Sequence, residues 1–583
     1  MRPMSEAPSL LTSEPTGGVL TGAPTGEPGG EPTNRPTGSG GPPSELTGRM
    51  RTVVGLAIVV VVVIGVILRF FTHSALWLDE ALTVDRARLP ISKIAGSVKQ
   101  DGAPPLYYYL LHFWMRVFGQ SNLATRSLSG VIGVITLPVA WLAGKRFGGR
   151  IVGWSTLVLL ASAPFAVYYS TEARMYGLII LLTGCGFLAL HRALVDGPKR
   201  GNLIAIAVVT AALLYTQYWS LYLVGVVGLW LLVVGLVGRR RAAAAVAAAA
   251  NGAGGAGTTD GAAWKRPLMA LVAMAVGCIL FIPWLPTFIY QSRYTGTPWA
   301  APPNFAAVIN AVTGFTANQG SSSSAGTDQG RLLALVYFAL FALALFGIGR
   351  SRRIIELDLH GRPRARGTSI AVVGTLFAAI AGGILTSSAF APRYAAVVFL
   401  PLLLVVALGV TTFLDERVRL GVLTVAVVAG LAGSFQNINT QRTQATKVAA
   451  VINARAKPGD IIAFCPDQLG PDAYRVIDHP SQYTLVTFPR GTSPAFVDWV
   501  NYAKTVHAAS ATTFAAKLVA DAGTTHHIWL VWQPGYQTYG VKCETMAATL
   551  LDQPTLGGHN WVTTNGRKYY EPMNLTEYAP KAG

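Results

Sequence analysis

The chain has 583 residues, of which 51% are apolar and 13% are charged. Soluble proteins carry about 25% charged residues, so this composition excludes an ordinary soluble protein and predicts a membrane protein. The net charge is +19, from 46 Lys and Arg against 27 Asp and Glu. Such an excess is typical of cytoplasmic loops of membrane proteins, and the sequence contains no nucleic-acid-binding motif. We therefore expect a lipid bilayer, and no nucleic acid, as a partner.

The first 50 residues repeat the tripeptide Pro-Thr-Gly at 15–17, 24–26 and 36–38. They contain few large apolar groups, so they cannot bury enough surface to offset the loss of chain entropy. We predict a disordered cytoplasmic tail over 1–50. The apolar run at 53–68 follows too late in the chain for a signal peptide and has no convincing cleavage site, so it is interpreted as a retained membrane helix.

Further apolar stretches are long enough to cross about 30 Å of hydrocarbon. Together with 53–68 they predict an α-helical polytopic membrane protein with about 11 transmembrane helices. These further spans are 123–143, 151–168, 177–194, 203–218, 220–237, 268–289, 332–349, 370–387, 394–413 and 418–435. With the amino terminus inside, the clusters of Lys and Arg between spans all fall in cytoplasmic loops, as the positive-inside rule requires.

The segment 104–118 determines the orientation of everything that follows it. It is apolar but only about 15 residues long and begins with two prolines, so we predict an interfacial helix rather than a span. This choice places the loops 72–122, 169–176, 290–331 and 388–393 outside the cytoplasm. An odd number of crossings then places the polar segment 436–583 outside as well.

The segment 436–583 has the pattern of a small α/β domain. Its predicted elements are a helix at 446–456, a turn at 457–460, a buried strand at 461–464, a helix at 514–522 and a strand at 527–532. Cys465 and Cys543 lie in this segment, where a disulfide and two reduced thiols are equally open alternatives. The predicted domains are the tail 1–50, a transmembrane catalytic module 51–435 and an extracytoplasmic α/β domain 436–583.

The first candidate site group is a pair of adjacent carboxylates, Asp79 and Glu80, a few residues beyond the first span, with Asp101 further along. Charges beside a bilayer need a reason, because an unpaired charge in hydrocarbon costs a few kcal/mol. One carboxylate could deprotonate an attacking hydroxyl while another orients it or binds a divalent cation. The alternative is that the pair only starts an interfacial helix.

Two further groups lie in later outer loops. Glu172, Arg174 and Tyr176 follow the third span, and in a turn Glu172 and Arg174 could contact different parts of a ligand; a structural ion pair is the alternative. Arg393 and Tyr394 lie at the outer mouth of a late span, where the guanidinium could bind a phosphate. Contact of this arginine with lipid headgroups is the alternative.

The order and spacing of these motifs resemble the GT-C glycosyltransferases, and within them the protein O-mannosyltransferases and lipid A aminoarabinose transferases. The resemblance covers roughly residues 50–435. It rests on the segments WLDEALT, DGAPPLYYYLLHFWMRVFG, TRSLSGVIGV, YYSTEARMYG and APRYAAV. It implies a multi-span enzyme that transfers a sugar from a polyprenyl-phosphate carrier to an acceptor outside the cytoplasmic membrane.

The resemblance also implies roles for individual residues. Asp79 matches the proposed general base and Glu80 its companion, with a divalent cation between them as an open possibility. The positions that match the substrate site are Asp101, Glu172, Arg174, Tyr176, Arg393 and Tyr394. Many relatives have His where this chain has Ala103, so no role of that His is carried over.

The predicted function is therefore that of an inverting membrane glycosyltransferase. Asp79 would take a proton from the acceptor hydroxyl, and Arg393 would stabilise the departing phosphate. Mannose is the expected sugar, with arabinofuranose or another pentose as the alternative. A glycolipid transporter or flippase would need ionisable groups near the middle of several spans, whereas the predicted spans are chiefly Val, Leu, Ala and Gly. The residue usage is typical of a GC-rich bacterium, for instance an actinobacterium.

Overall fold

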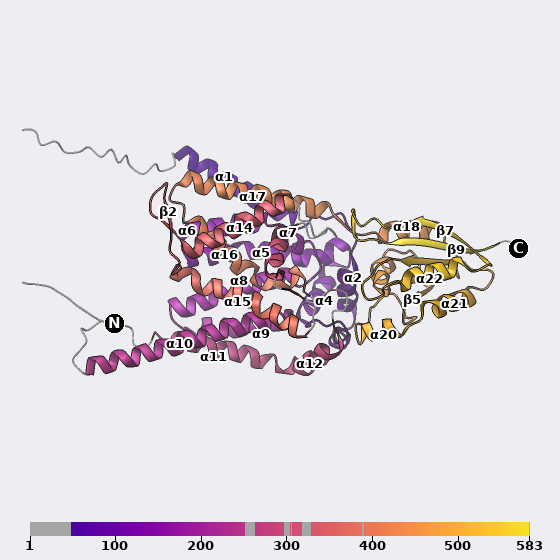
Figure 1. Ribbon diagram of the computed structural model, residues 1–583, viewed down its shortest axis with the longest axis horizontal. Coiled ribbons are helices and arrows are strands. Elements are labelled where there is room, and N and C mark those ends of the chain that lie inside the picture. Colours follow the sequence, from indigo (N-terminus) through magenta and orange to yellow (C-terminus); the bar gives the residue numbers. More distant parts are fainter. Residues whose placement is uncertain are drawn as a thin grey trace, which may run out of the picture. The chain divides into compact units, whose positions relative to one another are not determined.

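The computed structural model describes residues 48–250, 263–296, 303–304, 306–317, 328–386 and 390–581. The predicted disordered tail lies outside these residues up to position 47, and the first helix begins at Gly48. Most of the chain up to residue 439 is helical, and the sheets that carry β3 to β9 follow it (Figure 1).

Each predicted span coincides with a helix or with a run of helices. Nine of these, in the described ranges, are long and apolar enough to cross a bilayer. They are α1 (Gly48–Leu68), α5 (Asn122–Gly148), α8 (Tyr176–Val195), α10 (Ser220–Ala250), α11 (Lys265–Leu280) with η1 (Ile282–Trp284) and α12 (Leu285–Tyr294), α14 (Asp328–Phe346), α15 (Pro363–Thr386), η2 (Pro392–Ala395) with α16 (Ala396–Val410), and α17 (Glu416–Asn439).

The other two predicted spans differ from simple membrane helices. The span predicted at 151–168 is broken into α6 (Arg150–Ser162) and α7 (Pro164–Ser170), which are bent by 57°. The break occurs at Pro164, because proline lacks the N–H group that would continue the hydrogen-bonding pattern of the helix. The span predicted at 203–218 is α9 (Arg200–Thr216), only 17 residues long. By length and composition the described residues therefore hold nine or ten spans, against the predicted eleven.

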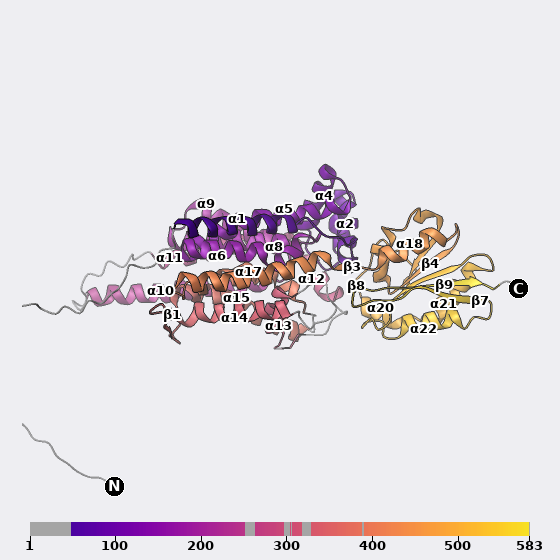
Figure 2. The same ribbon diagram turned by 90° about the horizontal axis from the view of Figure 1, so that it is seen from above.

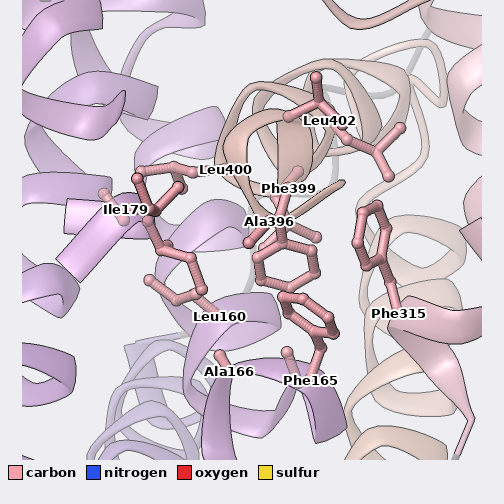
Figure 3. Close-up of a cluster of buried hydrophobic side chains, with 14 of the residues drawn as sticks. Leu160, Phe165, Ala166, Ile179, Phe315, Ala396, Phe399, Leu400 and Leu402 are labelled. Atoms are coloured by element: carbon pink, nitrogen blue, oxygen red, sulfur yellow. The ribbon is translucent and has the colours of Figure 1, made fainter. Parts of the chain in front are cut away.

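Helix α16 is the centre of the helical module. All of its residues are buried, as expected for a helix that is apolar on every side. Phe399 of α16 packs on Phe165 of α7, and both rings contact Phe315 of α13 (Ala307–Thr316), with centroid distances of 4.8 to 5.0 Å (Figure 3). At Gly409 an added Cβ would lie 1.9 Å from the Leu340 carbonyl oxygen, so glycine is required for α14 to approach α16 this closely.

Three short helices lie between the first two spans: α2 (Leu78–Arg88), α3 (Ile91–Val98) and α4 (Leu106–Phe118). Helix α4 is the predicted interfacial helix. Its 13 residues rise only about 20 Å, which is too short for a span. Tyr107 and Leu111 are buried, whereas Phe113 and Val117 are 54% and 74% exposed, so the helix is two-sided. Helix α4 packs against α2 and α5 (Figure 2).

The segment after α17 forms a five-stranded sheet in the order β5-β4-β6-β9-β7. Strands β4, β5 and β6 are parallel, and β9 is antiparallel to β6 and β7. Side chains alternate along β4: Ile461 and Ala463 face one core, and Ile462 and Phe464 face the other. Helix α18 covers one side of the sheet, and α21 and α22 cover the other (Figure 2).

The bounds of these elements agree with the predicted α/β pattern. A predicted helix, strand, helix and strand appear as α18, β4, α21 and β6. The strands are β3 (Gln441–Thr443), β4 (Ile461–Cys465), β5 (Thr484–Thr487), β6 (Ile528–Trp532), β7 (Leu556–Val562), β8 (Tyr569–Glu571) and β9 (Asn574–Pro580). The helices are α18 (Ala445–Arg455), η3 (Asp467–Leu469), α19 (Gly470–Tyr474), η4 (Pro480–Gln482), α20 (Tyr502–Ala508), α21 (Ala511–Ala522) and α22 (Lys542–Leu551).

Two small sheets complete the fold. Strands β1 (Gly347–Gly349) and β2 (Ile355–Leu357) form an antiparallel hairpin between α14 and α15. Strands β3 and β8 pair in parallel and so join the chain just after α17 to a segment near the carboxyl terminus. The β3-β8 pair matters for the site, because it brings Arg442 and Tyr570 to the end of the helical module.

Cys465 and Cys543 form a disulfide, which decides between the two alternatives left open by the sequence. Cys465 ends β4 and Cys543 lies in the first turn of α22, so the bond ties the centre of the sheet to a covering helix. The two cysteines are 78 residues apart. A cross-link over a loop of this length restricts the unfolded chain and stabilises the fold.

We predict that replacing both cysteines by serine lowers the free energy of unfolding by roughly 2 to 5 kcal/mol. The measurement is the melting temperature of the purified full-length protein, with and without a reductant. The wild type should lose stability on reduction and the double variant should not respond. Cys185→Ser is the control, because Cys185 is a free thiol. Equal melting temperatures for the wild type and the double variant would contradict the prediction.

Candidate functional site

Segments that are far apart in the sequence meet at one end of the helical module. They are the first turn of α2, the bend 171–175 between α7 and α8, the short helix η2 and the strand β8. The bend 171–175 follows the broken span α6-α7, in which the chain changes direction by 57° at Pro164. The sites predicted in separate outer loops are therefore neighbours.

Asp79 lies between two guanidinium groups. Its Oδ2 atom is 3.6 Å from Arg174 Nη2 and 3.8 Å from Arg393 Nη2. The side chain of Asp79 is 18% exposed and those of the two arginines are 12% and 16% exposed. Arg174 also donates to Thr83 Oγ1 at 2.9 Å, which orients it along α2. This arrangement places one carboxylate and two cations at a partly accessible position, which suits proton transfer next to an anionic group.

Glu80 points elsewhere, although it is adjacent to Asp79. The two residues occupy the first turn of α2, where neighbouring side chains diverge by about 100°. Glu80 is fully buried, and Arg126 donates to both of its carboxylate oxygens, at 2.7 and 2.5 Å. Arg442 donates to it at 3.3 Å, and the Ala173 N–H at 2.9 Å. The structure therefore assigns Glu80 to the framework, and not to the groups that could reach a substrate.

The Glu80 carboxylate is held in its charged form. Burial disfavours the charge, but the charges and hydrogen bonds of Arg126 and Arg442 outweigh burial and lower the pKa of Glu80. Arg442 is itself buried: it donates to Thr171 and lies 4.3 Å over the ring of Tyr168. Because Arg442 belongs to β3, this ion pair joins α2 and α5 to the segment after the last span.

Glu172 has a positioning contact of a different kind. Its Oε1 atom accepts a hydrogen bond from Trp77 Nε1 at 2.9 Å. Burial raises the pKa of Glu172 to about 7 against the opposing charge of Arg442. The ring of Trp77 lies 5.7 Å from the guanidinium carbon of Arg393. Glu172 therefore fixes an aromatic wall beside Arg393. Glu172 and Arg174 point at different protein partners, Trp77 on one side and Asp79 and Thr83 on the other, and the predicted contacts of the two residues with a ligand stay a prediction.

The remaining predicted residues fall into two places. Tyr176 and Tyr394 lie next to Arg393: its guanidinium is 5.6 Å from the ring of Tyr394, and its charge acts on the hydroxyl of Tyr176. That hydroxyl is buried and has no hydrogen-bond partner among the described residues. Asp101 instead pairs with Arg86 at 3.2 Å and accepts from the Tyr108 hydroxyl. The partners of Asp101 are thus Arg86 and Tyr108, which hold the fold together, and Asp101 does not join the cluster around Asp79.

Sequence reasoning missed the contribution of β8. The ring of Tyr570 packs edge-on against Trp77 at 5.2 Å, and its hydroxyl is hydrogen-bonded to Arg393. Glu571 accepts from the Leu78 N–H at 3.1 Å and so caps the start of α2. Nothing in the local pattern around residue 570 marks these two residues, because Trp77 and Leu78 lie about 490 positions earlier in the chain and Arg393 also belongs to a distant segment.

The residues do not fit the divalent cation considered for Asp79 and Glu80. The two carboxylates diverge, and each is already matched by arginine. Across the ranges that the structure describes, no three His, Cys, Asp or Glu side chains come together in a way that could hold a metal ion. We therefore derive no step through a metal.

We predict that Glu80→Gln lowers the free energy of unfolding by about 3 to 5 kcal/mol, because two guanidinium groups then lose their buried counter-charge. The measurement is the melting temperature in detergent. The control is Glu356→Gln: Glu356 pairs with Arg350 at 2.5 Å, but these side chains are 46% and 70% exposed. This exposed pair should contribute under about 1 kcal/mol. Equal losses in the two variants would refute a structural role of Glu80.

A second prediction concerns pH. Burial raises the pKa of Asp472 to about 7. Burial also raises the pKa of Glu571 well above its usual range, and the negative charge of the neighbouring Asp472 raises it further. In the unfolded chain both groups titrate near pH 4. The folded state therefore binds more protons between about pH 4 and pH 7, and its stability falls as the pH rises through this window.

Glu571→Gln should flatten this dependence, because glutamine keeps an acceptor for the Leu78 N–H and a donor for Asp472 without a titrating proton. We expect the melting temperature of the wild type to fall by several degrees between pH 4 and pH 7, and that of the variant to fall less. Asp521→Asn, at an exposed position of α21, is the control and should keep the wild-type slope. A variant with the wild-type slope would contradict the prediction.

The chain was compared with known proteins. Residues 102–250, which span α4 to α10, match a family model described as dolichyl-phosphate-mannose-protein mannosyltransferase. No curated protein matches the sequence. The fold is similar to crystal structures of ArnT from Cupriavidus metallidurans, in the apo state (TM-score 0.56) and bound to undecaprenyl phosphate (TM-score 0.53). Both matches have 14% identity and cover 91% of this chain and 99% of the other.

A weaker match is to the oligosaccharyltransferase of Archaeoglobus fulgidus in complex with Zn and sulfate. It has a TM-score of 0.45 and 11% identity, and covers 87% of this chain and 72% of that one. The family match thus covers the part of the chain from α4 to α10, and nearly the whole chain has a fold similar to that of ArnT.

Proposed function

We propose that this enzyme transfers a sugar from a polyprenyl-phosphate carrier to an acceptor hydroxyl at the outer face of the membrane, with Asp79 as the general base. One observation carries the proposal: Asp79 lies within 3.8 Å of both Arg174 and Arg393, and the three residues come from segments that are distant in the sequence. In such a reaction the base acts on the attacking oxygen and the cation on the leaving phosphate oxygen. Both oxygens are bonded to the same anomeric carbon in the transition state, so the two groups must belong to one small site.

A lipid-phosphate donor is supported by chemistry and by likeness. Arg393 has one Nη directed at Asp79, and its Nε is buried without a hydrogen-bond partner in the described part of the chain. A phosphate oxygen is a suitable partner for such a guanidinium. The similar ArnT structure contains undecaprenyl phosphate, and the matching family model is named for a dolichyl-phosphate-mannose donor.

The proposed reaction is a single displacement. The acceptor hydroxyl gives its proton to Asp79 while its oxygen forms a bond to the anomeric carbon. The bond from that carbon to the phosphate oxygen breaks, and its electron pair stays on the phosphate, which Arg393 stabilises. Arg174 holds Asp79 in place through the contact at 3.6 Å. Trp77, Tyr394 and Tyr570 surround Arg393 and offer flat faces to a sugar ring.

The location of the site is supported by the positions of the charges. Strand β8 and Arg442 join the sheets to the end of the bundle where Asp79 lies, whereas the basic clusters of the loops lie at the other ends of the helices. By the positive-inside rule that other side is cytoplasmic, so we propose that the site and the α/β segment are extracytoplasmic. The domain limits 51–435 and 436–583 remain part of this proposal.

The chemistry of the sugar is a finer proposal. Mannose is the proposed sugar, which the description of the matching family model supports, and arabinofuranose or another pentose is the alternative. A glycolipid transporter or flippase is not favoured. Such a protein would need charged partners for the headgroup near the middle of its membrane helices, whereas Asp79, Arg174 and Arg393 lie together at one end of the helices.

The test is transfer of labelled sugar from synthetic polyprenyl-phosphate mannose, and in parallel from polyprenyl-phosphate arabinofuranose, by purified protein in nanodiscs with an envelope extract as the acceptor source. We expect activity with the mannose donor, and a loss of at least a hundredfold in Asp79→Asn and in Arg393→Gln. Asparagine has the size of aspartate, so the melting temperature of Asp79→Asn should change little. The melting temperature of Arg393→Gln, whose side chain is shorter, is measured to confirm that the variant folds.

The matched control is Asp415→Asn. Asp415 caps α17 through its contact with the Arg417 N–H, and asparagine can keep this cap. It lies a whole helix away from the site, so transfer should be unchanged. Wild-type rates in Asp79→Asn would overturn the assignment of the base. A protein that moves labelled glycolipid across a bilayer without forming product would overturn the transferase itself.

A further inference from the structure

The helical module contains a second cavity, remote from Asp79. It has a volume of about 850 Å³ and is enclosed mainly by α8, α9, α10 and α15, with the ends of α5. Its walls are largely apolar and include Phe187, Leu190, Val227 and Trp230. The volume lies within the range of pockets that bind small organic ligands, about 300 to 1,000 Å³. Such a space among membrane helices suits hydrocarbon chains.

The cavity is as deep as one leaflet of a bilayer. On α8 its lining runs from Thr183 to Val195, which is about 18 Å of helix. Half of the hydrocarbon thickness is about 15 Å. The charged and imidazole groups of the lining, Arg146, His191 and Arg364, are confined to one end of this length.

That end carries positive charge. Arg146, His191 and Arg364 line it, and both arginines act electrostatically on the His191 ring. Arg146 binds Asp196 at 2.7 Å, but this single carboxylate does not balance both arginines. The Nδ1 atom of His191 is buried and has no hydrogen-bond partner among the described residues. The end of the cavity thus offers two guanidinium groups and one unpartnered ring nitrogen to an anion.

The charged end lies on the membrane face opposite the candidate site. Arg126 belongs to the cluster around Glu80, and Arg146 follows it 20 residues later on the same helix α5, which corresponds to about 30 Å. A phosphate at Arg146 could not present a sugar to Asp79. The cavity is therefore distinct from the place of the proposed donor headgroup.

We propose that this cavity binds an anionic phospholipid of the leaflet opposite the active site, with its acyl chains between α8, α9, α10 and α15 and its phosphate at Arg146, Arg364 and His191. Basic pockets between membrane helices on the cytoplasmic side bind anionic headgroups in this way. Arginine suits phosphate through paired hydrogen bonds. The proposal concerns a site apart from the transferase chemistry and stands whether or not that chemistry is as proposed.

The test measures binding of phosphatidylglycerol to the purified full-length protein, delipidated in a neutral detergent, by native mass spectrometry. Arg146→Gln/Arg364→Gln should bind it at least tenfold more weakly. The matched control is Arg150→Gln: Arg150 begins α6 at the same end of the bundle, is exposed and does not line the cavity. It should bind as the wild type does. Melting temperatures confirm that the variants are folded.

Other lipids separate the chemical sources of the phosphate. Phosphatidylethanolamine with the same chains should bind weakly, because it has no net charge, and glycerophosphoglycerol should bind weakly, because it has no chains. Ala371→Phe, which narrows the cavity and leaves the arginines intact, should also weaken binding of phosphatidylglycerol. Ala371 lines the cavity on α15.

Three results would overturn the proposal. The first is unchanged binding of phosphatidylglycerol in both the double variant and Ala371→Phe. The second is binding of glycerophosphoglycerol as strong as that of the intact lipid. The third is displacement of phosphatidylglycerol by an equal concentration of undecaprenyl phosphate, because the cavity would then serve the lipid of the donor instead.

Discussion

One buried ion-pair cluster holds the site together. Glu80 sits without exposure to solvent between Arg126 of α5 and Arg442 of β3, and it also accepts from the backbone of the bend 171–175. Removing charges from water is expensive, and the cost is offset only when every group has a well-placed partner. Here each partner comes from a different segment. The cluster therefore forms only when all of these segments are in their final positions.

The direction of Asp79 is a consequence of this constraint. Adjacent residues in a helical turn diverge, so once Glu80 is turned into the cluster, Asp79 must face the other way, toward Arg174 and Arg393. Glu571 and Tyr570 strengthen this arrangement from the carboxyl-terminal sheets, one by capping α2 and the other by packing on Trp77. The α/β segment thus contributes to the wall of the candidate site through its contacts at the start of α2.

The positions of the spans and of the α/β elements could be predicted from the sequence, because both follow from local hydrophobic patterns. A short helix at the position of α4 was predicted from the length of its apolar run and its two prolines, and its place at the membrane interface stays a prediction. The predicted turn before β4 is also present, and it contains Gly459, whose φ of 93° favours glycine. The number of crossings was less accessible. Whether α6 and α7 form one span depends on a 57° bend, which composition does not encode.

From the sequence alone one could tell that the chain is a membrane protein, where most of its helices lie and that acidic and basic motifs gather in loops between the predicted spans, because charge and hydrophobicity act over a few neighbouring residues. Which of these charges meet is set by the tertiary structure. It turned Asp79 and Glu80 toward different partners and paired Asp101 with Arg86. It also added Arg442 and Tyr570, whose contacts with Glu80 and Arg393 join residues far apart in the chain and leave no periodic trace in it.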